Sequence, residues 1–405
     1  MSSTDAVPAG ITGFVAGGGD RWRDPHPMYR WLRENDPVHH VVDGDYWVLS
    51  RFDDVAGAAI DTPSFSSAQG LTVTYGERES VGLDRDAMPI VMMDPPEHTD
   101  FRRLLARGFT PRRVAELEPA IRTFVTERIE RLRAAGSGDI VAEVFKPLPS
   151  FVVAHYLGVP ASDRDHFDGW TDAIVAANAD GGPLGAAEAV GEMIEYFVAL
   201  ADRRRREPGD DTITDLVRLQ EDGAPVSIVQ VLGYAFTMVA GGNDTTTGLL
   251  GGASVLLTQE PGQRRILVDE PASIPNAIDE FLRLTSPVQG LARTVTRDVE
   301  RHGRVIPEGR KVLLLYASAN RDEAMFGPSA DTCDVTRRSD RILSFGFGPH
   351  HCLGAAVAKL QARVTLEELL DRCPRFAVDA ERGEFAGGAY VRRYATLPFL
   401  ADATG

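Results

Sequence analysis

The chain has 405 residues, of which 43% are apolar and 25% charged, so it can bury the large core of a globular domain. Its 59 acidic residues outnumber 43 basic ones, and the net charge of −16 disfavours nucleic acid and anionic lipid as general partners. The three cysteines, Cys333, Cys352 and Cys373, are too widely spaced for a disulfide framework and favour a reducing compartment.

The beginning of the chain is polar and glycine-rich and has no basic stretch followed by an apolar run. It therefore predicts no secretory signal, and it lacks the roughly 20 apolar residues of a membrane anchor. No linker rich in proline, glycine or serine separates two self-contained patterns. We expect a flexible segment over residues 1–23, one large domain over residues 24–405, and a cytoplasmic protein without a membrane anchor.

The first elements are a helix and a hairpin. Asp24-Pro25 predicts a helix through about residue 34, because proline suits a first helical position. Strands at residues 38–42 and 46–49 should pair, since Asp43-Gly44 supplies the positive φ angles of a tight turn. Residues 64–93 then alternate apolar residues with glycine and proline. We expect this long loop to cover a ligand pocket, although ordinary packing under a loop explains it almost as well.

Several helices follow. Asp94 is expected to cap a helix that begins at Pro95, and on it His98 and Arg102 lie four residues apart on one face. Thr110-Pro111 predicts a further long helix, and others are expected over residues 144–157, 163–177 and 186–205. The predicted buried side of the long helix consists of Val114, Leu117, Ile121, Val125, Ile129 and Leu132.

A long central helix is predicted from Ser227, which forms a capping box with Gln230, to about Thr258. Each glycine inside a helix costs about 1 kcal/mol relative to alanine, so helix propensity alone does not explain the glycines in its second half. Another requirement must therefore favour residues without a side chain in this part of the helix. These glycines are Gly241, Gly242, Gly248, Gly251 and Gly252.

The most informative stretch is residues 345–354, a glycine-rich loop that holds Cys352 just before a predicted helix. Free N–H groups at a helix N-terminus lower a thiol's pKa, which suits a metal ligand or a nucleophile. The glycines favour close approach to something large and flat, such as a haem face. Two alternatives are a small buried cysteine and a zinc site with His350 and His351, but no second Cys/His cluster lies nearby.

Phe345, Gly348, His350, Cys352 and Gly354 match the cysteine-loop signature of the cytochrome P450 family, which the chain resembles from about residue 26 to 399. The resemblance implies a single large domain of the cytochrome P450 fold, mainly α with a smaller β region. It also implies that haem b, iron protoporphyrin IX, is the cofactor. Cys352 would be its axial ligand and the metal ligand, and Phe345, His350 and Gly354 would contact the haem.

Two further motifs carry the resemblance. The stretch 241–246 resembles the family's central-helix motif, in which Thr245 would hold oxygen and Asp244 would relay protons to it. The alternative for Thr245 is a hydroxyl that bonds back to its own helix. His98, Arg102 and Arg293 would bind haem propionates. The implied substrate pocket comprises Thr237, Ala240, Gly241, Val288, Gln289 and Leu291.

Glu280 and Arg283 lie three residues apart, a spacing that would contribute little on an exposed helix face. By resemblance the pair is buried and is completed by Arg337. It would then have a structural role, which is to fix the surroundings of the cysteine loop.

The resemblance implies a monooxygenase that activates dioxygen with two externally supplied electrons and hydroxylates or epoxidises a small apolar substrate. We expect a ferredoxin and a ferredoxin reductase to supply the electrons, and a basic face with Arg103, Arg112, Arg113 and Arg363 to receive the ferredoxin. Two alternatives are a peroxide-driven haem enzyme and a catalytically silent haem protein. The pair Asp244 and Thr245 argues against both.

Overall fold

The computed structural model describes residues 19–81, 88–164, 187–221 and 228–403, together with residues 166, 167, 169, 170 and 173. Of the segment expected to be flexible, residues 1–18 lie outside this part. Gly19–Trp22 forms a short 3-10 helix, buries Trp22, and donates the indole N–H to the carbonyl of Gly388 at 3.1 Å. Residues 19–22 of that segment thus contact the C-terminal part of the chain.

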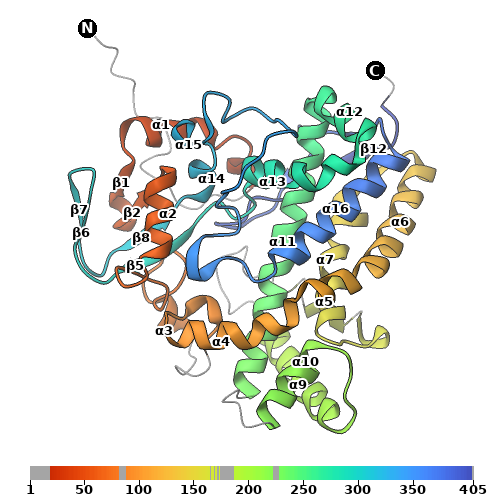
Figure 1. Ribbon diagram of the computed structural model, residues 1–405, viewed down its shortest axis with the longest axis horizontal. Coiled ribbons are helices and arrows are strands. Elements are labelled where there is room, and N and C mark those ends of the chain that lie inside the picture. The colour runs from red at the N-terminus through yellow and green to blue at the C-terminus, as the bar shows by residue number, and fades with distance from the viewer. Residues whose placement is uncertain are drawn as a thin grey trace.

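Helix α11, Ile228–Gln259, runs through the middle of the molecule, and other long helices pack around it (Figure 1). It contacts α7, Pro147–Tyr156, α13, Ile274–Thr285, and α16, Ala355–Arg372. Helix α6, Glu118–Ala135, packs along α16 on the outer side. The predicted central helix is confirmed over this range, whereas its expected cap at Ser227 lies outside the described residues.

The other helices surround this bundle or cover the sheet. The expected helices over residues 24–34, 144–157 and 186–205 are confirmed within a few residues, and the one over 163–177 lies partly outside the described residues. The remaining α-helices are α1 His26–Asn35, α2 Phe52–Ile60, α3 Glu77–Val81, α4 Glu97–Leu105, α5 Pro111–Glu116, α9 Ala187–Arg206, α10 Thr212–Glu221, α12 Pro261–Asp269, α14 Tyr316–Ala319 and α15 Glu323–Phe326. A π-helix spans Val141–Phe145, and 3-10 helices include Ile90–Met92 and Gly348–His350.

A five-stranded sheet lies beside the helices in the order β1-β2-β8-β5-β3 (Figure 1). Its strands are β1 Val38–Val41, β2 Tyr46–Leu49, β8 Lys311–Leu314, β5 Leu291–Val295 and β3 Phe65–Ser66. Strands β2 and β8 pair in parallel, and the other pairs are antiparallel. Smaller sheets join β4 Ser137–Asp139, β12 Pro398–Leu400 and β9 Ala377–Val378, then β6 Val299–Arg301 with β7 Arg304–Ile306, and β10 Glu384–Phe385 with β11 Tyr394–Thr396.

The predicted hairpin is confirmed, with Val38 opposite Leu49, but its turn differs from the expectation. The chain forms a 3-10 turn over Val42–Gly44, and the left-handed residue is Asp45, with φ 48°. Aspartate tolerates this conformation better than most residues, so the turn closes without a positive φ at Gly44.

Two predicted helix starts are corrected. The Asp94 carboxylate accepts the Ser67 N–H at 2.8 Å, so it holds the preceding loop, and α4 begins only at Glu97. Thr110 does cap its helix, but the chain breaks at Leu117 and restarts with Pro119 in the first turn of α6. The six apolar residues expected on the inner side are all buried.

Within the described residues, no helix combines the length and the apolar character needed to cross a bilayer.

Candidate active site around Cys352

The cysteine loop is folded by its glycines. Gly346 and Gly348 both have φ 69°, which an L side chain rarely adopts. A Cβ on Gly348 would also lie 2.7 Å from Cγ2 of Ile60 on α2, so the loop could not approach that helix with a larger residue. The Cys352 N–H then donates to the Phe345 carbonyl at 2.8 Å and closes the loop. These glycines are thus required by the loop itself, and not only by a flat ligand.

Cys352 lies two residues before Gly354, which is the N-cap of α16. Although the Cys352 side chain is exposed, the protein packed around its sulfur desolvates it and raises the pKa of the thiol. The Gly354 N–H at the helix N-terminus lowers this pKa, as expected, and so does the charge of Arg102, but desolvation outweighs both. A bound metal cation would supply the charge that holds the sulfur as a thiolate.

The two alternatives for Cys352 find no support. Cys352 is exposed, whereas Cys333 and Cys373 are buried, so Cys352 is not a small core residue. In the part of the chain that the structure describes, no group of three His, Cys, Asp or Glu side chains could hold a metal ion. A zinc site at His350, His351 and Cys352 is thus excluded there.

A cationic cluster, which we define as the charged Arg102 and Arg293 together with His98 and His350, lies beside the cysteine. The rings of His98 and His350 are 4.1 Å apart between centroids. Burial, reinforced by both arginines, lowers the pKa of His98 to about 4 and that of His350 to about 3, although Asp94 partly opposes this at His98. The buried Nδ1 of His98 has no hydrogen-bond partner among the described residues. This donor set fits a ligand that carries carboxylates, as haem does.

Asp244 and Thr245 lie on α11, and both have partners. The Thr245 hydroxyl donates to the Gly241 carbonyl at 2.9 Å, as in the alternative that we considered for it, and its oxygen remains an acceptor. Nε of Arg393 lies 2.6 Å from Oδ1 of Asp244. Sequence reasoning missed Arg393, because no spacing in the chain connects it with Asp244.

The glycines of α11 serve two purposes. A Cβ on Gly248 would lie 2.7 Å from the Arg392 carbonyl, and one on Gly252 would clash with Thr285, so both admit close packing. A Cβ on Gly241 would meet nothing within 4 Å. Only Gly241, beside Thr245, thus leaves open space of the kind that a ligand needs.

The cysteine loop and α11 share one apolar cluster. Leu353, next to Cys352, packs against a cluster that includes Tyr234 and Val239 of α11, just before Gly241. Arg102 interacts electrostatically with Cys352 from α4. The structure thus gathers the cationic cluster, the thiol and the start of the 241–246 motif in one region.

The predicted buried ion pair is present and is connected to the cysteine loop. Glu280 and Arg283 are fully buried and 2.7 Å apart, and Nε of Arg337 lies 3.2 Å from Glu280. Arg283 donates to the Asn320 carbonyl at 2.8 Å. The Asn320 side chain in turn accepts the Leu343 N–H at 2.8 Å, two residues before Phe345. The pair therefore anchors the start of the cysteine loop.

Known proteins of one family resemble the chain over nearly its whole length. A family model described as Cytochrome P450 matches residues 274–382, which contain the buried ion pair and Cys352. Cytochrome P450 130 of Mycobacterium tuberculosis is 59% identical over 388 residues, which cover 94% of this chain and 96% of that protein. The chain belongs to the cytochrome P450 family. It is therefore a monooxygenase, and the family implies a haem-thiolate centre.

Other cytochromes P450 agree in sequence and in fold. Vitamin D(3) 25-hydroxylase of Pseudonocardia autotrophica is 36% identical over 365 residues, 89% of each chain. The structure of CYP109Q5 from Chondromyces apiculatus matches with a TM-score of 0.85 and 34% identity, and covers 95% of this chain and 97% of that one. CYP109E1 from Bacillus megaterium, solved with testosterone, gives a TM-score of 0.84 at 28% identity over 94% of this chain and 100% of that one. The expected fold, mainly α with a smaller β region, is confirmed.

Gln289 differs from its expected place in the substrate pocket of this cytochrome P450. Its amide nitrogen donates to the Ser286 carbonyl at 2.6 Å, and its oxygen accepts the Tyr29 hydroxyl at 2.9 Å. The side chain is buried, so its polar groups are used inside the protein. We therefore omit Gln289 from the proposed pocket.

The other expected pocket residues lie on α11 and at or just before the start of β5. The Thr237 hydroxyl donates to the Gly233 carbonyl at 2.7 Å, and Leu291 begins β5. Val288 forms an isolated bridge with Val391. The side chain of Ala240 lies outside the described part of the structure.

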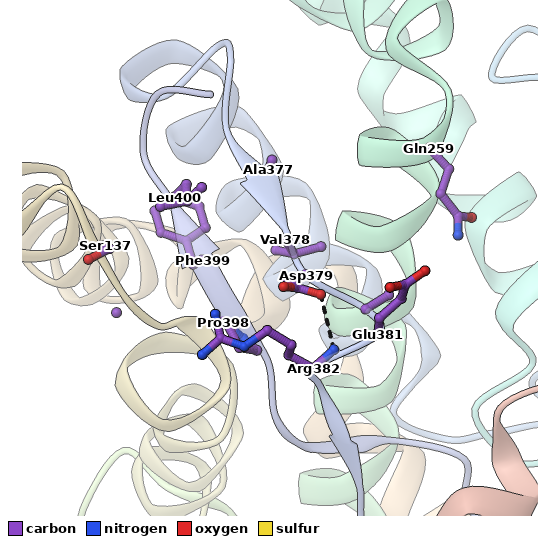
Figure 2. Close-up of a pocket in the computed structure, with 12 residues that line it drawn as sticks. Ser137, Gln259, Ala377, Val378, Asp379, Glu381, Arg382, Pro398, Phe399 and Leu400 are labelled. Atoms are coloured by element: carbon purple, nitrogen blue, oxygen red, sulfur yellow. Dashed lines mark hydrogen bonds between the residues drawn. The ribbon is translucent and has the colours of Figure 1, made fainter. Parts of the chain in front are cut away.

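One pocket formed by described residues lies elsewhere in this cytochrome P450. It measures about 660 Å³ and is formed by the small sheet β4-β12-β9 and the end of α11 (Figure 2). None of the candidate site residues lines it. A smaller pocket of about 180 Å³ adjoins the cysteine loop at Phe345, His351 and Lys359.

The cationic cluster gives a test of cofactor binding in this cytochrome P450. We expect Arg102→Gln and Arg293→Gln each to speed the transfer of haem to apomyoglobin by roughly 10- to 100-fold, because each removes a charged hydrogen bond worth about 1.5–3 kcal/mol. Arg103→Gln is the matched control, since Arg103 is exposed and pairs with Asp100 at 3.1 Å. Equal transfer rates for Arg102→Gln, Arg293→Gln and Arg103→Gln would show that the cluster does not hold the cofactor.

Proposed function

We propose that this cytochrome P450 hydroxylates or epoxidises a small apolar substrate, with dioxygen as oxidant and two electrons from a ferredoxin and a ferredoxin reductase. Haem b is bound with Cys352 as its axial ligand, and residues 24–405 act as one domain in the cytoplasm. His98, Arg102 and Arg293 bind the propionates. Further proposed contacts of the haem are Phe345, His350 and Gly354.

The observation that carries the proposal is the position of Cys352. An accessible thiol stands before the first turn of α16, Arg102 of the cationic cluster interacts with it electrostatically, and Leu353 packs with α11. A reactive cysteine alone needs no cationic cluster, and an anion site alone needs no thiol. A cofactor that carries both a thiolate-binding metal and carboxylates accounts for all of these features.

Haem, when bound, supplies the activation of dioxygen and the insertion of one oxygen atom into the substrate. The chain's own residues orient the oxygen substrate and deliver protons to it. Thr245 Oγ1 can accept a hydrogen bond from a water molecule, or from the oxygen substrate once that has received a proton, while its own hydrogen is held by Gly241. Asp244 exchanges protons with water and passes them on toward Thr245. Gly241 leaves room for the oxygen substrate beside them.

Thr245→Ala tests this division of roles. We expect the variant to consume reductant at a rate similar to wild type but to release most of the oxygen as peroxide, because nothing holds the oxygen substrate for proton delivery. The measurement is product formed per reductant consumed, together with a peroxide assay. Ser254→Ala is the control, since Ser254 makes the same kind of bond to Leu250 on α11, at 2.9 Å. Product yield as high in Thr245→Ala as in Ser254→Ala would refute the assigned role.

The arginines of the expected docking face form ion pairs within the protein. Each arginine assigned to this face has a carboxylate partner, so its charge is already balanced. The pairs are Arg103 with Asp100, Arg112 with Glu116, Arg113 with Asp215, and Arg363 with Glu367. A ferredoxin remains the proposed donor on the strength of the family, and we propose this face as its docking site, with the neighbouring carboxylates lowering the net positive charge that the face presents.

Turnover under two sets of conditions tests the function. We expect product from dioxygen, NAD(P)H, a ferredoxin and its reductase, and much less from peroxide alone. Compounds are first selected by the shift of the haem absorption band that displacement of a water ligand causes. Steroids belong in the screen beside terpenoids, fatty acids and polyketides. One relative is named vitamin D(3) 25-hydroxylase, and the structure of another was solved in complex with testosterone. Product with peroxide only would favour the peroxide-driven alternative, and no product at all would favour the silent one.

A further inference from the structure

Asp244 is held by a residue from the C-terminal part of the chain. Nε of Arg393 lies 2.6 Å from Oδ1 of Asp244, and the two side chains are only 11% and 22% exposed. At such low exposure the pair is screened less by solvent than a surface pair, so it fixes the carboxylate more firmly. The orientation of Asp244 therefore depends on where Arg393 is placed.

Arg393 is placed by backbone contacts on both sides. Its carbonyl accepts the Ala386 N–H at 3.0 Å, and the preceding Arg392 N–H donates to the Pro287 carbonyl at 2.8 Å. The bare backbone of Gly248, one turn after Asp244, lets the Arg392 carbonyl approach α11. Any Cβ there would push the segment, and with it the Arg393 side chain, away from the helix.

The same segment, residues 390–394, also contacts residues 288 and 289, which lie just before β5 and include the proposed pocket residue Val288. Val391 bridges Val288, and the Gln289 N–H donates to the Tyr390 carbonyl at 2.8 Å. The Tyr390 hydroxyl accepts the Val73 N–H at 2.9 Å, in the loop expected to cover the pocket. One short segment thus connects the substrate side, the covering loop and Asp244.

We propose that Arg393 is a positioning residue that orients Asp244 for proton delivery and connects this delivery to the substrate side of the pocket through residues 390–394. The inference rests on the proposed function, because it assigns Asp244 the proton relay. A substrate that presses on Val288 shifts the segment at Val391, and the Arg393 guanidinium moves with it. Asp244 is then held in the delivering orientation only when the pocket is filled.

The proton balance is simple. Each product requires two electrons and two protons, because one oxygen atom leaves as water. Asp244 receives each proton from bulk solvent through water molecules and gives it to the oxygen substrate held by Thr245, so the carboxylate is regenerated after each transfer and no hydroxide is left in the site. The electrons come from the ferredoxin, as in the proposed function.

A double-mutant cycle tests the inference. Arg393→Gln is expected to lower product per reductant by roughly 10-fold and to raise the solvent kinetic isotope effect, because proton delivery becomes slower. In the Asp244→Asn background the same change is expected to have no further effect, since the residue it acts on is already replaced. Arg393→Lys keeps the charge and should recover much of the yield. A merely structural role would lower yield equally in both backgrounds.

The controls separate failure of this inference from failure of the proposed function. Arg375→Gln removes another C-terminal Arg–Asp pair, with Asp402 at 2.8 Å, and should leave yield and isotope effect unchanged. The absorption of the reduced, carbon monoxide-treated protein shows whether each variant is folded. If Arg393→Gln is not folded, Arg393→Lys replaces it in the double-mutant cycle. No product from wild type would sink the proposed function. If wild type forms product, two results would overturn only the role of Arg393. One is that the losses of yield in Arg393→Gln and Asp244→Asn are additive, and the other is that Arg393→Gln has no effect on yield.

Discussion

Cys352→His is expected to abolish turnover while the protein still binds haem. An imidazole can occupy an axial position, but it donates less electron density than a thiolate and so supports cleavage of the O–O bond poorly. The measurement is product formation with the ferredoxin system on protein whose haem content has been matched to wild type. We expect a loss of at least about 1,000-fold, since the step that depends on the ligand is lost entirely.

Cys333→Ala is the matched control for this prediction. Cys333 is buried in the apolar core, where a cofactor cannot reach its sulfur, whereas Cys352 is exposed. Removal of the Cys333 thiol should cost some stability but leave turnover per haem intact. If Cys352→His retained wild-type turnover, or if Cys333→Ala lost it, the ligand would have been assigned to the wrong residue.

Glu280→Ala is expected to destabilise the protein by about 3–5 kcal/mol, because it leaves Arg283 charged and unpaired in the core. Both side chains have zero exposure, and Arg283 also holds the Asn320 carbonyl next to the cysteine loop. We therefore expect a lower unfolding midpoint in urea together with a lower haem content after purification.

The control is an ion pair of the same kind on the surface. Glu116→Ala breaks a pair with Arg112 whose side chains are 50% and 89% exposed, and such pairs contribute about 0–1 kcal/mol. If Glu280→Ala shifted the urea midpoint no more than Glu116→Ala does, the buried pair would not be the structural anchor described above.

Local chemistry made much of this fold and site predictable. The hairpin at residues 38–49, the central helix and the cysteine loop are specified by residues close together in the chain, and all are observed. Glu280 and Arg283 could be paired because three residues place them on one helix face. Pro119 was a readable signal for the break between α5 and α6, since proline favours a first helical turn.

The remaining features depend on contacts that sequence spacing does not encode. Asp94 follows the rule for an N-cap, yet the Ser67 N–H offers its carboxylate a tertiary partner that a local rule cannot see. Gly248 has no side chain because the Arg392 carbonyl approaches it, and the side-chain oxygen of Gln289 accepts a hydrogen bond from Tyr29, a residue 260 positions away in the chain. Arg393 reaches Asp244 only in the folded chain.

The pKa of the Cys352 thiol likewise depends on tertiary contacts that the sequence does not encode. A helix N-terminus predicts a lowered pKa for Cys352, but desolvation by the surrounding protein outweighs it, and the amount of protein around a side chain is a tertiary property. The docking arginines are a parallel case, since their partners include Asp215 and Glu367 from other parts of the surface.

Sulfur ligation of a haem iron by Cys352 is the central claim, and an absorption spectrum tests it most directly. The purified protein is reduced, carbon monoxide is added, and the difference spectrum is recorded for wild type and for Cys352→His. The account predicts the strongly red-shifted band of a thiolate-ligated haem in wild type and its disappearance in the variant. A wild-type spectrum without that band, or the same band in Cys352→His, would contradict it.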